Sequence, residues 1–128
     1  RDPEMSRGLG DVYKRQPELY VAAVEPAASP VLNGGKAGPH KIPGIGAGFV
    51  PKFYDPKLID EVIDIKDEEA ADMAKATARC EGLAVGVSAG AALAAAVKIG
   101  QRQEMKGKNI VVILPDAAER YLSTGLLD

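Results

Sequence analysis

One short pattern has the spacing of a serine nucleophile: the G-x-S-x-G formed by Gly86-Val87-Ser88-Ala89-Gly90. In serine hydrolases this pattern puts the serine on a sharp turn between a strand and a helix. Hydrolase chemistry also needs a histidine, and in the α/β-hydrolase order it follows the serine. The only histidine, His40, precedes Ser88. A hydrolase therefore stays open only through a new combination of Glu25, His40 and Ser88.

The start of the helix that follows Ser88 favours a different use of this serine. A helix N-terminus carries main-chain N–H groups without partners inside the helix, and these suit an acceptor atom of a ligand. The next residues, Ala89 to Ala92, are all small. Small side chains indicate that something packs closely against this helix start. We therefore predict that Ser88 contacts a ligand.

The glycine-rich segment that precedes this motif carries two incomplete phosphate-binding patterns. Gly44-Ile45-Gly46-Ala47-Gly48 begins like a dinucleotide fingerprint, but Phe49 occupies the position of the required third glycine. A P-loop fails too, because neither Ser nor Thr follows Lys36. Lys36, His40 and Lys41 form a small basic cluster, which fits either a solvated loop or a contact with an anion or a partner.

Composition excludes several classes of protein. The net charge of −2 over 128 residues gives no reason to expect nucleic acid or an anionic membrane as partner. The longest uncharged run, 82–97, is shorter than a membrane span requires. A single cysteine, Cys80, excludes an internal disulfide and predicts a cytoplasmic location, and with one histidine it makes no metal site.

Apolar periodicity and breaker residues predict alternating strands and helices. We expect strands at 19–24, 58–65, 83–87 and 109–114, helices from an N-cap at Asp67 to Gly82 and from Ser88 as cap to Gln101, a short helix at 119–126, and a long structured loop at 33–51. This order predicts the α/β class, with a three-layer parallel sheet that has helices on both faces.

The first sixteen residues, RDPEMSRGLGDVYKRQ, differ in character from the rest because they are charged throughout and have no apolar period. Residues 11–16 resemble a translated transposase adapter used in DNA library preparation. We therefore interpret residues 1–16 as a non-native tail and place the folded part at 17–128. A natural charged tail is the alternative.

Four segments taken together resemble one enzyme family, the cysteine synthases (O-acetylserine sulfhydrylases) of the fold-type II pyridoxal-phosphate enzymes. The segments are 24–30 (VEPAASP), 38–49 (GPHKIPGIGAGF), 81–91 (EGLAVGVSAGA) and 111–124 (VVILPDAAERYLST). Their order and spacing are similar to the C-terminal part of that family's large domain. Cystathionine β-synthase shares the serine motif but lacks the His-Lys-Ile and Glu-Arg-Tyr-Leu-Ser-Thr signatures.

The resemblance implies a role for each candidate residue. The hydroxyl of Ser88 would bind the pyridine nitrogen of pyridoxal 5'-phosphate. The main chain of Gly44, Ile45, Gly46 and Ala47 would lie beside the substrate. Lys36, His40 and Lys41 match positions at which the family docks the C-terminal tail of serine acetyltransferase. The parent enzyme would be a homodimer that makes L-cysteine and acetate from O-acetyl-L-serine and sulfide.

The same resemblance also shows what the sequence lacks. The family's Schiff-base lysine, its Ser/Thr-Gly-Asn loop and its glycine-rich phosphate loop have no counterpart in these 128 residues. We therefore assign no catalytic residue and expect the chain alone to be inactive. A non-catalytic homologue that binds serine acetyltransferase and a cystathionine β-synthase-like enzyme are the alternatives. Pro43 replaces a usual glutamine, and Ala118 replaces a usual glycine whose loss we expect to strain the turn.

Overall fold

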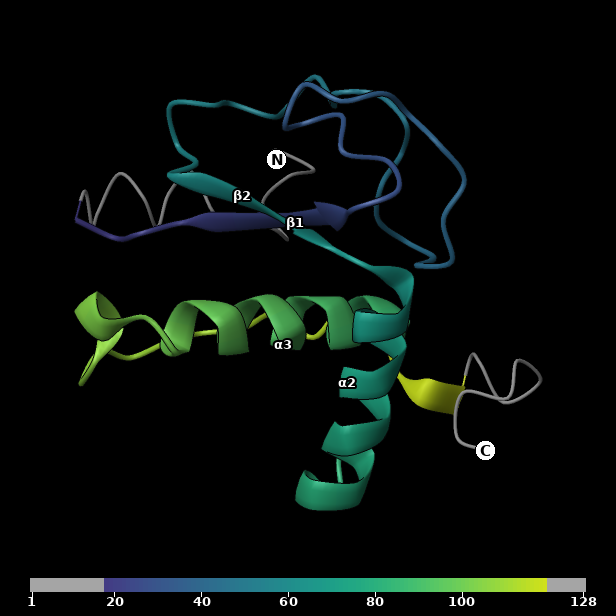
Figure 1. The fold of residues 1–128 in the computed structure, drawn as a ribbon, viewed down its shortest axis with the longest axis vertical. Coiled ribbons are helices and arrows are strands. Elements are labelled where there is room, and N and C mark those ends of the chain that lie inside the picture. The colour runs from purple at the N-terminus through teal and green to yellow at the C-terminus, as the bar shows by residue number, and fades with distance from the viewer. Residues whose placement is uncertain (1–17, 120–128) are drawn as a thin grey trace, which may run out of the picture.

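The computed structural model of the protein describes residues 18–119, in which a pair of parallel strands lies along one helix while a second helix projects away from the strands (Figure 1). The elements are β1 (Ala22–Pro26), β2 (Glu61–Ile65), α2 (Asp67–Glu81), α3 (Val87–Gly100) and the short 3-10 helix η2 (Gln103–Met105). The strands pair in register from Ala22 opposite Glu61 to Pro26 opposite Ile65.

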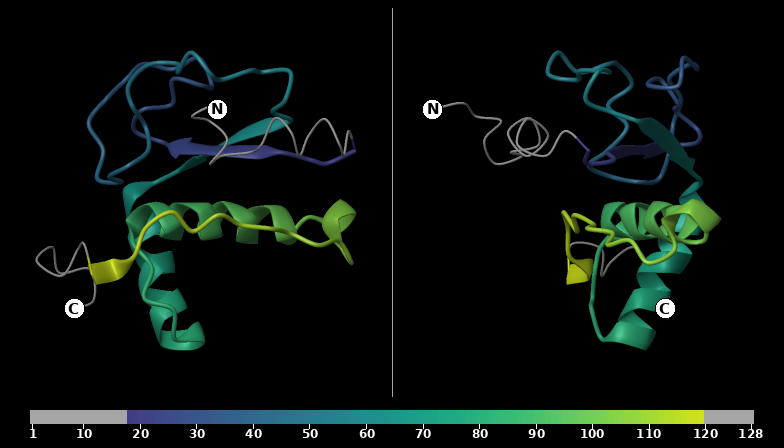
Figure 2. Two further views of the ribbon diagram at one scale, coloured as in Figure 1. Left: turned by 180° about the vertical axis from the view of Figure 1, so that it is seen from behind. Right: turned by 90° about the vertical axis from the view of Figure 1, so that its left-hand side faces the viewer.

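The layers are arranged around α3. In Figures 1 and 2, α3 runs along one side of the sheet and α2 projects away from it, while the connection from β1 to β2 lies on the opposite side of the sheet. The predicted parallel α/β class is confirmed. The predicted helices on both faces are not found within residues 18–119, because the long connection covers the second face there.

Two of the predicted strands are not formed. Residues 83–87 contribute only one isolated antiparallel bridge, Val85 to Ala117, and residues 109–114 run extended without a ladder. A strand requires a neighbour that takes its main-chain hydrogen bonds. Val111 is 88% exposed and Ile113 74% exposed, so no described segment covers them. The predicted helix at 119–126 lies outside the described residues except for Glu119.

The N-cap of helix α2 lies one residue before the predicted cap. Lys66 is the N-cap, and its N–H donates to Glu69 Oε1 at 3.2 Å. Asp67 is the first helical residue instead, and its Oδ2 accepts the N–H of Lys41 at 3.0 Å. The prediction of Asp67 as the cap was therefore wrong, because its carboxylate is directed to the loop. Gly82 ends α2 in the left-handed conformation, as its φ of 68° shows.

The two helices cross where their side chains are smallest. Gly90 of α3 faces Ala70 and Ala74 of α2, and both alanines are buried. Small residues allow two helix backbones to approach closely, so this stretch of α3 sets its distance from α2. Away from the crossing, Lys98 Nζ and Glu69 Oε2 form an ion pair at 2.8 Å.

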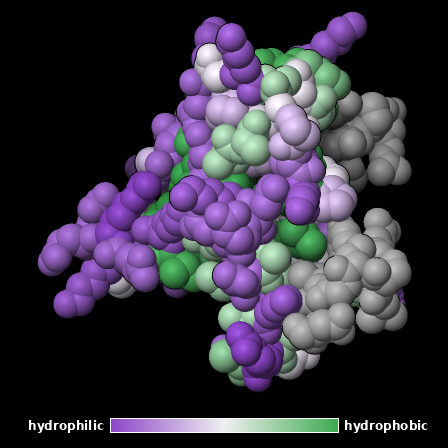
Figure 3. All heavy atoms as spheres, turned by 45° about the vertical axis from the view of Figure 1, so that its right-hand side comes forward, coloured by the Kyte–Doolittle hydropathy of each residue, from purple (hydrophilic) through white to green (hydrophobic). Residues whose placement is uncertain are grey.

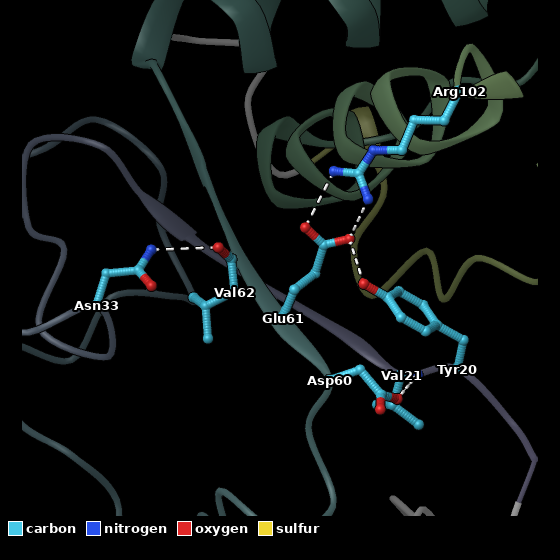
Figure 4. Close-up of polar contacts among 7 residues, drawn as sticks. All are labelled: Tyr20, Val21, Asn33, Asp60, Glu61, Val62 and Arg102. Atoms are coloured by element: carbon cyan, nitrogen blue, oxygen red, sulfur yellow. Dashed lines mark hydrogen bonds and ion pairs between the residues drawn. The ribbon is translucent and has the colours of Figure 1, made fainter. Parts of the chain in front are cut away.

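A polar cluster joins the end of α3 to the first residue of β2 (Figure 4). Glu61 accepts from both terminal nitrogens of the Arg102 guanidinium, with Nη2 at 3.0 Å from Oε2, and from the Tyr20 hydroxyl at 2.8 Å. The guanidinium lowers the pKa of Glu61, and the bond to Glu61 raises the pKa of Tyr20. A carboxylate with two partners is well suited to hold α3 against the sheet.

The surface carries separate apolar areas. Figure 3 shows hydrophobic residues in patches between hydrophilic ones, not as one continuous area. Within residues 18–119 and outside 109–114, the most exposed large hydrophobics are Phe49 at 64% and Phe53 at 65%, both in the long connection. No helix within residues 18–119 is long and apolar enough to cross a membrane.

Candidate functional site

Ser88 lies in the first turn of α3 and is 5% exposed. The N-cap of the helix is Gly86, not Ser88 as predicted, and Val87 is the first helical residue. A short main-chain clip holds this start: the Gly86 N–H donates to Asp116 O at 3.1 Å, and the Ala118 N–H donates to Ala84 O at 3.0 Å. The predicted turn between an extended segment and a helix is therefore present, and it is fixed by a segment about thirty residues further on.

The amides of this helix start are already bonded. The Asp116 carboxylate accepts the Ala89 N–H at 2.9 Å and the Ser88 N–H at 3.3 Å. The expectation that N–H groups at this helix start are available to a ligand is therefore wrong for Ser88 and for Ala89. No hydrogen bond among the described residues uses the Ser88 hydroxyl. The hydroxyl is thus the group of Ser88 that can serve a ligand.

The glycine loop passes directly beside Ser88. A Cβ placed on Gly44 would lie 3.9 Å from Ser88 Oγ, and Gly44 has a φ of +92°. A residue with a side chain would be strained in this conformation and would narrow the space at the hydroxyl. The structure thus brings Gly44 and Ser88 together, although they are 44 positions apart.

Further along the loop, Gly46 packs on the carboxyl end of β1. A Cβ on Gly46 would come within 2.5 Å of Pro26 Cγ and 2.6 Å of His40 Nε2. The site therefore lies at the carboxyl ends of the parallel strands, which is where open α/β sheets bind ligands. Gly44 and Ala47 are exposed, whereas Ile45 and Gly46 are half-buried.

The His40 ring is part of the loop's own structure. Its Nδ1 accepts the Ile42 N–H at 3.2 Å, so the ring proton is on Nε2, which bonds Gly46 O at 3.0 Å. Both nitrogens are thus engaged with main chain between Lys41 and Gly46. A base for Ser88 needs a nitrogen directed at the serine hydroxyl, so this arrangement argues against the hydrolase alternative.

Glu25 anchors the beginning of the loop, a role that sequence reasoning did not assign to it. The side chain is 2% exposed and accepts the N–H groups of Leu32 at 2.8 Å and Asn33 at 3.0 Å. Burial raises the pKa of Glu25, the two N–H donors act in the opposite direction, and nearby Asp64 adds to the rise. The Asn33 side-chain amide then donates to Val62 O on β2 (Figure 4). It also donates to Asp64 Oδ1 on the same strand. The loop therefore begins from a fixed turn.

The basic residues of the loop differ in what they present to solvent. Lys36 and Lys41 are exposed, and the main-chain N–H of Lys41 donates to Asp67 Oδ2. Ile42, the residue after Lys41, is fully buried and holds this part of the loop in the hydrophobic core.

Ala118 does not have a positive φ, so the backbone strain expected from the loss of glycine at this position is absent. Within residues 18–119 no group of three or more His, Cys, Asp or Glu side chains could hold a metal ion.

The fold and the candidate site together have the features of an α/β ligand-binding protein. These features are a parallel strand pair, a glycine loop at its carboxyl end and a buried helix start beside that loop. The family model for pyridoxal-phosphate dependent enzymes matches residues 5–116, and the chain belongs to that family. The match begins inside the segment interpreted as a non-native tail, and the origin of residues 1–16 stays a prediction.

Individual relatives are similar over nearly the whole chain. Cysteine synthase of Staphylococcus aureus is 44% identical over 121 residues, which is 93% of this chain and 38% of the relative. Cysteine synthase from Entamoeba histolytica has a TM-score of 0.90 at 43% identity, covering 92% of this chain and 35% of that one. An O-acetylserine dependent cystathionine beta-synthase from Helicobacter pylori has a TM-score of 0.82 at 44% identity, covering 89% and 37%. The chain thus spans little more than a third of these relatives.

The residues present fit one end of pyridoxal phosphate. The hydroxyl of Ser88, which has no hydrogen-bond partner among the described residues, and the glycine backbone beside it can accept a flat ring whose nitrogen needs a hydrogen-bond donor. Of the small residues that follow Ser88, Gly90 packs against Ala70 and Ala74 of α2, so its small size serves the helix crossing and not a ligand. The described residues therefore suit the ring-nitrogen end of the cofactor.

Proposed function

We propose that this chain is part of a cysteine synthase, a transferase that makes L-cysteine and acetate from O-acetyl-L-serine and sulfide with pyridoxal phosphate. The observation that carries the proposal is the approach of Gly44 to the Ser88 hydroxyl at the carboxyl end of β1. The identities of 43–44% to cysteine synthases support it.

In this proposal the Ser88 hydroxyl binds the pyridine ring of the cofactor and sets how strongly the ring withdraws electrons. When bound, pyridoxal phosphate supplies the electron sink for replacing acetate by sulfide at the substrate's β-carbon. A neutral hydroxyl donates to the ring nitrogen but does not keep it protonated as a carboxylate would, so the sink is a moderate one. The bare main chain of Gly44 and its neighbours leaves room for the amino-acid part of the substrate. In the reaction, these residues therefore orient the cofactor ring and the substrate and set the polarity around the ring nitrogen.

Replacing Ser88 by alanine is expected to weaken cofactor binding. A longer protein that contains this chain would be titrated with pyridoxal phosphate and followed by the visible absorption of the bound cofactor. Loss of one buried hydrogen bond predicts about tenfold weaker binding. Thr77→Val is the matched control, because it removes a hydroxyl that bonds Met73 O inside α2.

Two outcomes bear directly on this prediction. Equal affinity in Ser88→Ala and the parent would remove Ser88 from the cofactor site. The 128-residue chain alone is expected to give neither a stable absorption band nor cysteine, because the family's Schiff-base lysine has no counterpart in it. A band together with cysteine formation would overturn that expectation.

The Helicobacter pylori relative supports a second candidate, a cystathionine β-synthase-like enzyme that uses the same acetylated serine. The two differ in the incoming sulfur nucleophile, so rates with sulfide and with a thiol amino acid separate them. A non-catalytic homologue that binds serine acetyltransferase is separated by the upstream sequence, where a Schiff-base lysine motif supports the enzyme.

For partners, we infer a homodimer in the cytoplasm and docking of the serine acetyltransferase C-terminal tail on Lys36, His40 and Lys41. Exposure of both lysines on a loop with fixed ends supports a contact with an acidic, carboxylate-ended peptide. Because the His40 ring bonds its own loop, it shapes the contact and the lysines supply the charge.

Charge reversal at Lys36 and Lys41 is expected to abolish most of this peptide binding. The double variant Lys36→Glu, Lys41→Glu should bind a decapeptide with an acidic C-terminus more than about tenfold more weakly than the parent in a fluorescence titration. The parent's affinity should fall with added salt. Lys52→Glu, an exposed lysine further along the same connection, is the control. Equal affinities in all three proteins would contradict the docking proposal.

A further inference from the structure

Asp116 bonds the start of α3 through both its main chain and its side chain. Its main-chain oxygen accepts the Gly86 N–H at 3.1 Å, and its carboxylate accepts the amides of Ser88 and Ala89 at 3.3 and 2.9 Å. Three amides around the candidate serine thus depend on one residue that is 28 positions away. These contacts fix the direction in which the first turn of α3 presents its side chains.

The charge of Asp116 matters at this place because α3 has no acid of its own there. The first turn of α2 contains Asp67, Glu68 and Glu69, whereas the first turn of α3 contains none. A helix N-terminus carries about half a positive charge, and a carboxylate on its amides offsets that charge. The acid that α2 has in its own sequence is thus supplied to α3 by a distant segment.

We propose that Asp116 is the positioning residue of Ser88: it fixes the helix start so that the serine hydroxyl faces the glycine loop, and its charge offsets the positive helix end beside the cofactor ring. The electrostatic half of this proposal rests on the proposed function. A positive helix end disfavours a proton on the ring nitrogen, so Asp116 makes that nitrogen more basic than it would be beside a bare helix end.

The positioning half is tested in the 128-residue chain without cofactor. Amide hydrogen exchange at Ser88 and Ala89 should be at least about tenfold faster in Asp116→Ala, because both amides lose their acceptor. Asp116→Asn should recover part of the protection, since the amide oxygen still accepts an N–H. Asp72→Asn, which removes an exposed acid of α2, should leave both rates unchanged. Unchanged exchange in Asp116→Ala overturns the positioning role.

The electrostatic half is tested in the longer, cofactor-loaded protein by the pH profile of the cofactor's absorption band. Asp116→Asn should move the profile to lower pH, because it removes the charge while its amide oxygen still accepts an N–H, and Asp72→Asn should leave the profile unchanged. A shift to lower pH in Asp116→Asn supports the proposal, and an unchanged profile in a protein that binds cofactor overturns its electrostatic half. If the longer protein binds no cofactor, the proposed function fails, while the exchange experiment still decides the positioning role.

Discussion

Replacing Gly90 by alanine is expected to lower the free energy of unfolding by about 3 kcal/mol or more, which is the upper range for overpacking a tight core. A Cβ on Gly90 would lie 2.1 Å from Ala70 O and 3.0 Å from Ala74 Cβ. The first of these atoms belongs to the α2 main chain, so no side-chain rotation relieves the contact. The helices must separate, and urea unfolding followed by circular dichroism measures the loss.

Gly100→Ala is the matched control in the same helix. A Cβ there meets only the end of the Ile110 side chain, at 3.3 Å, and alanine favours a helix over glycine by about 1 kcal/mol. We expect Gly100→Ala to be neutral or slightly stabilising. If the two variants unfold at the same urea concentration, the crossing of α2 and α3 is not held at the distance that the structure shows.

The helices could be predicted from the sequence because their signals are local. Gly82 lies at the end of the segment that it terminates, and it ends α2 as predicted. The caps were misplaced by one or two residues. For α2 the reason is that Asp67 bonds Lys41, a residue of a loop whose position the sequence does not show.

The strands were predicted less well because a strand depends on what lies beside it. The apolar run 109–114 satisfies every local criterion, yet Val111 is almost fully exposed. The chain spans 38% of its Staphylococcus aureus relative. The residue types of 109–114 thus favour a strand, but the described residues do not include a neighbouring strand with which it could pair.

For the candidate site too, some features could be predicted from the sequence and others could not. The pattern around Ser88 and the glycine loop could be recognised, and the structure places Gly44 beside Ser88. Asp116 and Glu25 could not be assigned their roles, because each carboxylate bonds main-chain N–H groups, and no residue type marks an amide as a partner. Both acids lie near the end of a predicted strand and beside a glycine loop or a helix start. This position in the sequence is the signal that could have indicated the roles of Asp116 and Glu25.

Replacing Gly46 by alanine is expected to displace the glycine loop from the end of β1 and to lower the free energy of unfolding by about 2–5 kcal/mol. The left-handed conformation, with φ of +66°, costs an alanine about 1–2 kcal/mol. The new Cβ would also lie 2.5 Å from Pro26 Cγ and 2.6 Å from His40 Nε2, and overpacking adds about 1–3 kcal/mol. Because the proline ring is fixed and buried, the loop must yield, and the bond from His40 to Gly46 O is lost with it.

Gly48→Ala separates these two causes. Gly48 has a φ of +82°, so alanine is strained there to a similar extent, but its Cβ would meet only Ala37 Cβ, at 3.7 Å. The excess destabilisation of Gly46→Ala over Gly48→Ala therefore measures the contact between the loop and β1. The His40 ring resonances should shift in Gly46→Ala and stay unchanged in Gly48→Ala. Equal unfolding free energies and equal spectra would mean that the loop does not rest on Pro26, and the approach of Gly44 to Ser88 would lose its support.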